Sequence, residues 1–283
     1  MPKEVPSGLS VQLPPPAART PLHDNENLGL CDVYHLNGQP DAGAEIAFFL
    51  SVPWCSAHLK PAKDRPPGSA ARPVVHIVLP NSRRRGRPVP NADGSLTSSA
   101  ETHSNFFATT LHSPDTIGAF IVFYEEPPPS PDNHLDYRAP VLELKALLRL
   151  GPGLNGHRGV VHGGMVATIF DEVLALLMPL NYRRAKHNRR VGAVAPPPPV
   201  SASTTGPEAA AAASANVHNG FVTSYLKTTY LRPVRTPGLV LVTARYARLE
   251  GARKFYVEGA IWDDRSQALA KADCLFVALK EKL

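Results

Sequence analysis

The chain has 283 residues, 43% of them hydrophobic, which is enough to bury one sizeable core. Its thirty prolines are about twice the usual share, and they cluster, so part of the length is expected to be loop or linker. The net charge of +6 favours anionic partners. The basic residues are not interleaved with aromatic residues along one face, however, which argues against a nucleic-acid-binding protein.

Basic residues concentrate in two runs, 82–87 (SRRRGR) and 182–190 (YRRAKHNRR), beside proline-rich or polar sequence. We interpret both as solvated loops, with a nuclear signal or a phosphate-binding rim as alternatives. The three cysteines form no CxxC pair, so we expect neither a metal site nor a disulfide framework, and no cofactor. The start of the chain has no signal-peptide or transit-peptide pattern, and no apolar run reaches the length of a membrane span. A cytoplasmic protein is expected, in preference to a mitochondrial one.

Residues 1–100 are predicted to be a largely irregular extension, interrupted by a short helical segment or helix pair near 44–59. In that segment Pro53 would start or break a helix, with Trp54 as its anchor. The run 74–79 (VVHIVL) is predicted as an isolated strand.

The organised domain is predicted to span residues 101–283. A short helix at 102–111 is followed by strands at 117–126 and 141–150, a glycine-rich connection, and a long apolar helix from residue 163 to 178. A low-complexity insertion is expected at about 182–216, after which come four strand-like segments at 221–232, 239–249, 253–263 and 268–279. Short turns join the last three, so we expect an antiparallel meander. The fold class is α+β, with one buried helix wrapped by an antiparallel sheet.

The long helix is apolar around nearly its whole circumference, with one exception. At the helical period the residues Gly164, Thr168, Asp171 and Ala175 form one strip of small or polar side chains, with Asp171 in its middle. A buried carboxylate costs several kcal/mol unless it is paired or used, so Asp171 needs a partner or a role. It is either a structural hydrogen-bond acceptor or a catalytic group. Glu172 points about 100° away and is expected to pair, cap or face solvent.

The sequence His162-Gly163-Gly164 lies where this helix begins. The first backbone N–H groups of a helix have no intrahelical partners, and the helix dipole there favours negative charge. Glycines at this point remove side chains that would block an approaching oxygen, which is the outline of an oxyanion hole. Asp171, two turns on, could act at the same carbon as general base or nucleophile. His162 could contact the substrate, or its ring could hold the glycine turn through backbone hydrogen bonds.

The segment GVVHGGMVATIFDE (159–172) resembles the helix signature of the hotdog-fold thioesterases, in particular the phenylacetate-pathway and THEM-type acyl-CoA thioesterases. The segment LKTTYLRPVRTPG (226–238) resembles, more loosely, the strand that follows the helix in this family. The resemblance implies a long helix wrapped by an antiparallel sheet. It also implies hydrolysis of an acyl thioester and a homodimer, or a dimer of dimers, whose site is shared.

By position, the resemblance implies that Asp171 is the base or nucleophile, that the Gly163 N–H polarises the thioester carbonyl, and that Thr223 places water or substrate. Because the site is shared, Thr223 is expected to act across the subunit interface from Asp171. Several relatives carry Asn or Gln six residues before the HGG histidine, where this chain has Gly156; the neighbouring Asn155 or His157 could replace that amide. Gly164 and Thr168 are expected to line the substrate site, and Arg232 and Arg235 either meet coenzyme A phosphates or are ordinary surface residues.

The function expected from these residues is metal-free hydrolysis of an acyl thioester, with acyl-CoA as the expected substrate class. Two alternatives remain open at this point. One is a hotdog module that binds an acyl chain, or serves as a scaffold, without turnover. The other is a thioesterase that acts on a polyketide or fatty acyl chain attached to a carrier protein.

Overall fold

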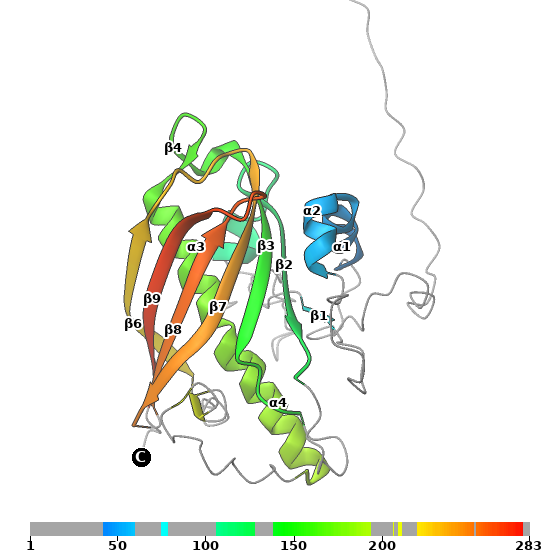
Figure 1. Ribbon diagram of the computed structural model, residues 1–283, viewed down its shortest axis with the longest axis vertical. Coiled ribbons are helices and arrows are strands. Elements are labelled where there is room, and N and C mark those ends of the chain that lie inside the picture. Colours follow the sequence, from blue (N-terminus) through cyan, green and yellow to red (C-terminus); the bar gives the residue numbers. More distant parts are fainter. Residues whose placement is uncertain are drawn as a thin grey trace, which may run out of the picture.

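The computed structural model describes residues 42–59, 75–78, 106–127, 138–193, 206, 209–210, 220–251 and 253–279. Within them a long helix lies along one face of a seven-stranded antiparallel sheet, and a short helical hairpin lies on the other side (Figure 1). The expected α+β hotdog fold is confirmed. The predicted irregular stretch before residue 42, the basic run 82–87 and most of the predicted insertion lie outside the described residues.

The strands of the sheet are bounded as follows: β1 (Val75–Val78), β2 (Ile117–Glu125), β3 (Glu143–Leu150), β6 (Phe221–Tyr230), β7 (Gly238–Glu250), β8 (Lys254–Trp262) and β9 (Ala268–Ala278). Their order across the sheet is β1-β2-β3-β7-β8-β9-β6. The three strands joined by short turns, β7, β8 and β9, form the predicted meander. The strand-like segment before them, β6, lies outside this meander, because it pairs with β9 at the far edge of the sheet.

Strand β1 corrects a second expectation. The run that contains it is not isolated, since Val75–Val78 pairs antiparallel with β2 and is the other edge of the sheet. Part of the predicted N-terminal extension therefore shares a sheet with the predicted C-terminal domain. The predicted short helix at 102–111 is a single π-helical turn, η4 (Phe106–Thr110), within the described residues.

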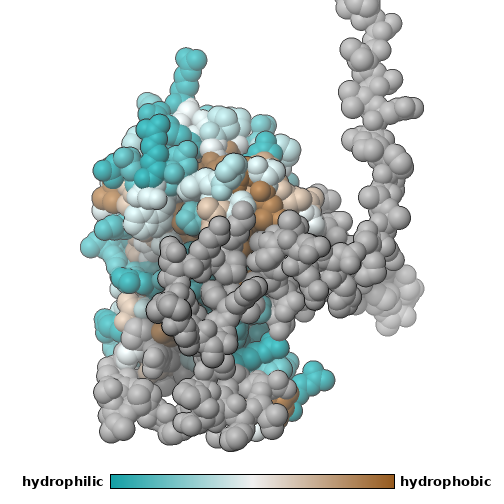
Figure 2. Space-filling view, turned by 45° about the vertical axis from the view of Figure 1, so that its right-hand side comes forward, coloured by the Kyte–Doolittle hydropathy of each residue, from teal (hydrophilic) through white to brown (hydrophobic). Residues whose placement is uncertain are grey.

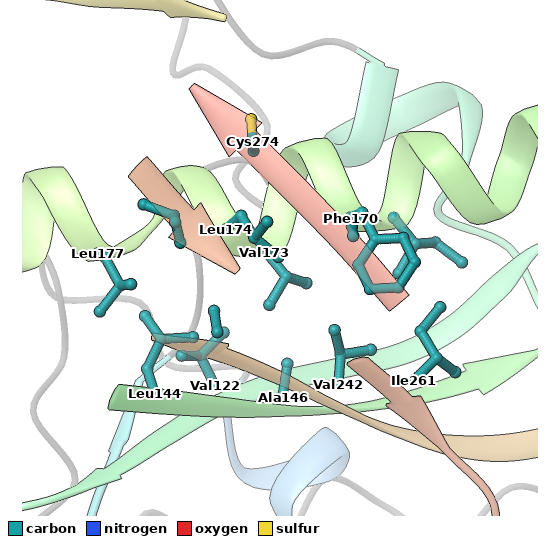
Figure 3. Close-up of a cluster of buried hydrophobic side chains, with 14 of the residues drawn as sticks. Val122, Leu144, Ala146, Phe170, Val173, Leu174, Leu177, Val242, Ile261 and Cys274 are labelled. Atoms are coloured by element: carbon teal, nitrogen blue, oxygen red, sulfur yellow. The ribbon is translucent and has the colours of Figure 1, made fainter. Parts of the chain in front are cut away.

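The central helix has two segments, α3 (Gly163–Ala175) and α4 (Leu177–Val191). Side chains of α3 that face the sheet are completely buried, as their continuous apolar pattern predicts. Figure 3 shows Phe170, Val173, Leu174 and Leu177 pointing toward Val122, Leu144, Ala146, Val242 and Ile261 of the sheet. Together α3 and α4 are long and apolar enough to cross a membrane by length and composition, a test that the core helix of a globular protein also passes.

Helix α4 corrects the interpretation of residues 182–191, which were predicted as loop and insertion. They continue the helix because one of its faces bonds to the backbone just before β3. Asn181 exchanges hydrogen bonds with both backbone groups of Val141, at 2.8 and 2.9 Å, and Asn188 does the same with Arg138. Between them the buried Arg184 donates to the Ala139 carbonyl at 2.6 Å.

The other face of the sheet is covered by α1 (Ala42–Ser51) and α2 (Pro53–Leu59), the predicted helix pair with Pro53 at the start of its second helix. Phe49, Cys55 and Leu59 are its fully buried contacts, whereas Trp54 is half-buried, so the prediction of Trp54 as the anchor is wrong. This covering explains why β2 is apolar on every residue from 119 to 124. Alternate side chains of a strand face opposite sides, and here each side has a core.

The glycine-rich connection before α3 contains a 3₁₀ turn, η5 (Pro152–Leu154), and a small hairpin of β4 (Asn155–His157) and β5 (Val160–Val161). A side chain at Gly151 would lie 2.4 Å from the backbone of Asp115. One at Gly156 would lie 2.7 Å from the Cα atom of His162. The connection is glycine-rich because the backbone passes close to its neighbours at these two positions.

Gly259 on β8 lies where the neighbouring strand and helix α3 both come close to the backbone. A Cβ atom there would lie 2.5 Å from the Thr243 carbonyl oxygen and 2.7 Å from Leu174 Cδ1. We therefore expect Gly259→Ala to lower the free energy of unfolding by about 1–3 kcal/mol, measured by urea denaturation. The control is Gly43→Ala on α1, where a Cβ meets nothing within 4 Å and the stability should hardly change. Equal losses in both variants would contradict the close approach.

The ion pair that holds α4 to the strands predicts a pH dependence. Burial alone would raise the pKa of Glu126, but hydrogen bonds with His76 and with the Arg184 guanidinium outweigh it and lower the pKa to about 2. The ionised carboxylate therefore stabilises the fold above the ordinary Glu pKa, and this contribution is lost as the pH falls from about 5 to about 2.

Glu126→Gln should remove that part of the acid sensitivity. At pH 7 the variant should also lose about 3–5 kcal/mol of stability, because Arg184 would stay buried without its carboxylate. Urea denaturation at a series of pH values measures both effects. Glu143→Gln, at a half-exposed carboxylate, is the control and should change the stability by less than about 0.5 kcal/mol. If the free energy of unfolding of Glu126→Gln fell with pH below 5 as steeply as that of the wild type, Glu126 would not be the group whose titration causes the loss.

Candidate active site

The strip of small and polar residues on α3 faces strand β6. At the start of the helix the Tyr230 hydroxyl donates to the Gly163 carbonyl at 2.8 Å. Two turns later the Thr223 hydroxyl donates to Asp171 Oδ1 at 2.7 Å. Strand and helix thus run alongside each other in opposite directions, with Tyr230 and Thr223 at the two ends of the contact. Thr168, within the strip, bonds back to the Gly164 carbonyl at 2.9 Å.

Asp171 and Thr223 meet within one chain. The expectation that they act across a subunit interface is therefore wrong. Asp171 is half-buried and Thr223 is exposed, so the pair lies at the boundary between the core and solvent. Among the described residues, Thr223 supplies the one hydrogen bond found to the Asp171 carboxylate. The remaining lone pairs of this carboxylate can accept a proton from a water molecule or a ligand.

A β-bulge brings Thr223 to the helix. Strict alternation would put Leu226, Thr228 and Tyr230 on one face of β6 and Thr223 on the other. The pairing with β9 shifts between Thr223 and Tyr225, which inserts one extra residue into β6. Thr223 then pairs with Phe276, a residue of the inner core, and its hydroxyl points to α3.

The beginning of α3 is capped by His162. Its Nδ1 atom accepts a hydrogen bond from the Gly164 N–H at 3.0 Å, and its carbonyl accepts from the N–H groups of Met165 and Val166. His162 therefore holds the glycine turn, which was one of its two expected roles. The Gly164 N–H is occupied by this cap, so Gly164 can line the substrate site only through the absence of a side chain. The Gly163 N–H has no acceptor within the described part of the chain.

The distance between Gly163 and Asp171 limits how the two groups can act together. Eight residues of α-helix rise roughly 12 Å along the axis. An amide and a carboxylate that far apart on one helix cannot contact the same carbonyl group. The prediction that both act at one carbon therefore requires groups from two copies of the chain, as the resemblance to dimeric relatives implies.

The remaining predicted residues lie around the start of α3. Asn155 accepts a hydrogen bond from the buried Thr236 hydroxyl, so its side-chain oxygen holds the loop after β6. His157 is exposed in the β4–β5 hairpin. Arg232 donates to the Ala268 carbonyl at 2.9 Å, at the start of β9, and Arg235 is exposed. Among the described residues none of these four side chains is hydrogen-bonded to Asp171, and Asn155 and Arg232 bond to loop residues instead.

Three residues of the site region were not singled out from the sequence. Alternation along residues 221–230 would have placed Thr228 and Tyr230 on one face, but nothing in the pattern tells which face meets the helix. Thr228 Oγ1 is buried without a partner among the described residues, between Tyr230 and Thr223. Cys274 lies on β9 opposite Leu226. Burial, with the nearby Asp171 charge, raises the pKa of its thiol to about 12, so it stays protonated and is not a nucleophile.

Metal-assisted chemistry has no ligand set in the described ranges. Nowhere among those residues do three His, Cys, Asp or Glu side chains gather as a metal ion would require. The chemistry that the described groups can support is proton transfer by a carboxylate and stabilisation of an oxyanion by a helix amide.

Comparison with known proteins gives one family match, to the thioesterase superfamily over residues 208–270, which covers β6 to the beginning of β9. Verlamelin biosynthesis protein B from Lecanicillium sp is 24% identical over 172 residues, 60% of this chain and 71% of that protein.

Among solved structures, the chain is similar to the BH2602 protein from Bacillus halodurans with CoA, at 21% identity and a TM-score of 0.32, over 50% of this chain and 70% of the other. Thioesterase superfamily member 2 from Mus musculus is 12% identical with a TM-score of 0.33, over 49% of this chain and 76% of the other. The family match falls on the strands after α3, and the motif that indicated the family lies at the start of α3, so two separate segments agree. The resemblance of this chain to the hotdog-fold thioesterases is thereby confirmed.

Proposed function

We propose that the chain is an acyl thioester hydrolase in which Asp171 is the general base and acyl-CoA is the substrate class. The Asp171–Thr223 pair carries this proposal. A half-buried carboxylate, held by one hydroxyl in the middle of a strip of small residues, is positioned to take a proton from water. The match to the thioesterase superfamily supports the reaction type, and the motif around Gly163 supports the substrate class.

In the proposed reaction Asp171 removes a proton from water while the water oxygen attacks the thioester carbon. The carbonyl oxygen becomes negative in the tetrahedral intermediate. The Gly163 N–H, at the positive end of the α3 dipole, donates a hydrogen bond to it. When the intermediate collapses, the carbon–sulfur bond breaks, the proton passes to the thiolate, and the products are a carboxylic acid and a thiol. Thr223 orients the carboxylate, and His162 and Tyr230 hold the turn that contains Gly163.

The separation of Gly163 and Asp171 on α3 leads us to propose that the reaction takes place between two copies of the chain. A two-fold axis that passes near Ala167, midway between Gly163 and Asp171, would bring Asp171 of one copy to Gly163 of the other. Small residues at Gly164, Ala167 and Thr168 allow a close approach there. Each dimer would then hold two complete sites.

Strand β6 supports this pairing. It is the last strand in the sheet order and has a neighbour on one side only, within the described residues. Its side chains Val222, Tyr225 and Tyr230 are 49, 45 and 55% exposed. An exposed strand edge with large hydrophobic side chains is a surface that proteins usually cover, and a second β6 would cover it.

The Asp171→Asn variant tests the base. Loss of the base should lower kcat by about 10²–10⁴-fold, while Asn can still accept the Thr223 hydrogen bond and keep the fold. Release of free thiol is measured on a panel of short, medium, long and aromatic acyl-CoA and acyl-pantetheine substrates. Glu172→Gln removes the same charge from the next residue of the helix and should keep its activity.

Three outcomes would count against the proposal or a part of it. Turnover that survives in Asp171→Asn would mean that another group is the base. A folded wild-type protein that hydrolyses no member of the panel would favour acyl binding without turnover. Preference for acyl-pantetheine over acyl-CoA would favour a carrier-bound substrate, in agreement with the biosynthetic name of the Lecanicillium relative.

A complementation experiment tests the shared site. Gly163→Pro removes the proposed oxyanion donor at the first position of α3, where proline is tolerated, and the extended backbone of His162 suits a following proline. Alone it should lower kcat by about 10²–10³-fold. Coexpressed with Asp171→Asn, it should restore about a quarter of wild-type turnover, because half of randomly paired dimers are mixed and each has one intact site.

Sites confined to one chain would give no such recovery. The control is a mixture of Gly163→Pro with the double variant Gly163→Pro/Asp171→Asn, which contains no complete site in any pairing and should stay inactive. Both mixtures are checked by size-exclusion chromatography, so that failure to form dimers is separated from failure to share a site.

A further inference from the structure

A concave pocket lies on the side of the sheet covered by α1 and α2. Its volume is about 500 Å³, within the range of small-molecule pockets, roughly 300–1,000 Å³. Figure 2, which brings this side of the molecule forward, shows hydrophobic residues gathered in the upper part of the described surface among hydrophilic ones. The walls come from three places: the start of α2, the loop between β6 and β7, and the turn between β8 and β9.

The lining combines a flat aromatic ring, an apolar floor and a charged rim. Trp54 and Val52 from the helical hairpin face Leu239, Val240 and Leu269 of the sheet. The rim carries two arginines, Arg235 and Arg265, and two aspartates, Asp263 and Asp264.

The charged groups of the rim are not equally available to bind a ligand. Asp263 caps the β8–β9 turn, since its Oδ1 atom accepts from the N–H groups of Arg265 and Gln267 at 3.0 and 2.8 Å. Arg235, Arg265 and Asp264 are exposed. Two guanidinium groups and one carboxylate can therefore contact a ligand. A purely apolar ligand would cover these groups without satisfying them, which costs free energy.

The pocket and the start of α3 share one neighbour, the loop between β6 and β7. Pro233, in its wall, follows Tyr230 by three residues, so their Cα atoms lie within roughly 11 Å. The Tyr230 hydroxyl in turn contacts the Gly163 carbonyl. The loop that carries Arg235 is bonded to the segment before α3, through Val161 N–H to the Val234 carbonyl at 2.9 Å and Thr236 N–H to the Gly159 carbonyl at 3.1 Å. One loop separates the two sites.

We infer that this pocket receives the nucleotide end of a CoA thioester, with the adenine ring against Trp54 and the phosphates at Arg235 and Arg265. The inference rests on the proposed function, since CoA is taken as the carrier of the acyl group. An aromatic base fits the indole and the apolar floor, phosphate oxygens fit guanidinium groups, and Asp264 can accept from the adenine amine or a ribose hydroxyl. The helical hairpin thereby takes part in substrate selection.

The first test measures binding without turnover. Desulfo-CoA is titrated into the full chain by calorimetry, and Trp54→Ala should weaken its binding by about tenfold to a hundredfold, the loss expected for one stacked base. Trp54→Phe keeps an aromatic ring and should recover most of the affinity. Because Phe49, Cys55 and Leu59 hold the hairpin, Trp54→Ala is expected to fold. Circular dichroism checks this, and Arg235→Gln/Arg265→Gln is a second variant with unchanged packing, which should also weaken binding.

The second test uses substrates that differ only in the nucleotide. In Trp54→Ala the KM for acyl-CoA should rise about tenfold to a hundredfold relative to that for the matching acyl-pantetheine. Desulfo-CoA affinity that is the same in wild type and Trp54→Ala, or absent in wild type, would overturn the inference. If the protein binds desulfo-CoA through Trp54 but hydrolyses no thioester, the inferred nucleotide pocket stands and the proposed hydrolase activity is wrong. The two failures are therefore distinguishable.

Discussion

The close contact between α3 and the sheet determines where every group of the site lies. A helix that is apolar around most of its circumference can be buried only if strands surround it, and at Gly259 of β8 the Thr243 carbonyl and Leu174 of α3 together leave no room for a side chain. The helix cannot rotate without exposing Phe170 or Val173, both fully buried. Its strip of small residues is therefore fixed toward β6, and the amide of Gly163 and the carboxylate of Asp171 are fixed at the two ends of that strip.

The position of Asp171 and its neighbours explain why a carboxylate is tolerated on this helix. Asp171 lies at the border of the core, with one oxygen bound by Thr223 and the buried Cys274 thiol nearby. The negative charge favours the neutral thiol, which is the form that burial favours as well, so the two groups do not conflict. A purely structural carboxylate would gain from further donors, and none is found among the described residues. The arrangement suits a carboxylate that acts as a proton acceptor at the edge of the core.

The sequence predicted the parts of this site that depend on one periodicity. The strip on α3 followed from the helical period, and the strands followed from apolar content between turn residues. Thr223 could not be placed in the same way, because a bulge of one residue exchanges the two faces of β6 and no residue type signals it. The role of His162 was left open because a cap and a substrate contact require the same exposed ring.

Helix α4 shows the opposite difficulty. Its second half carries arginine, lysine, asparagine and histidine, which as a composition indicates a solvated loop. The residues that matter, Asn181, Arg184 and Asn188, recur at helical spacing, but they are polar, and hydrophobic periodicity does not detect them. What makes them a buried face is the backbone before β3, whose N–H and C=O groups they satisfy. A polar stripe can thus replace an apolar one when it meets unpaired backbone rather than side chains.

The helical hairpin of α1 and α2 shows that composition also misplaces the domain boundary. Its sequence is separated from the rest by proline-rich stretches, which indicates an appendage. Yet the alternate residues of β2 form two cores, and the second, with Ile121 and Phe123, would face water without α1 and α2. Glu45 adds a directed contact, since its carboxylate accepts the Phe120 N–H at 3.0 Å. A strand that is apolar on both faces therefore requires a second cover, and in this chain the cover comes from the segment that composition alone would have set aside.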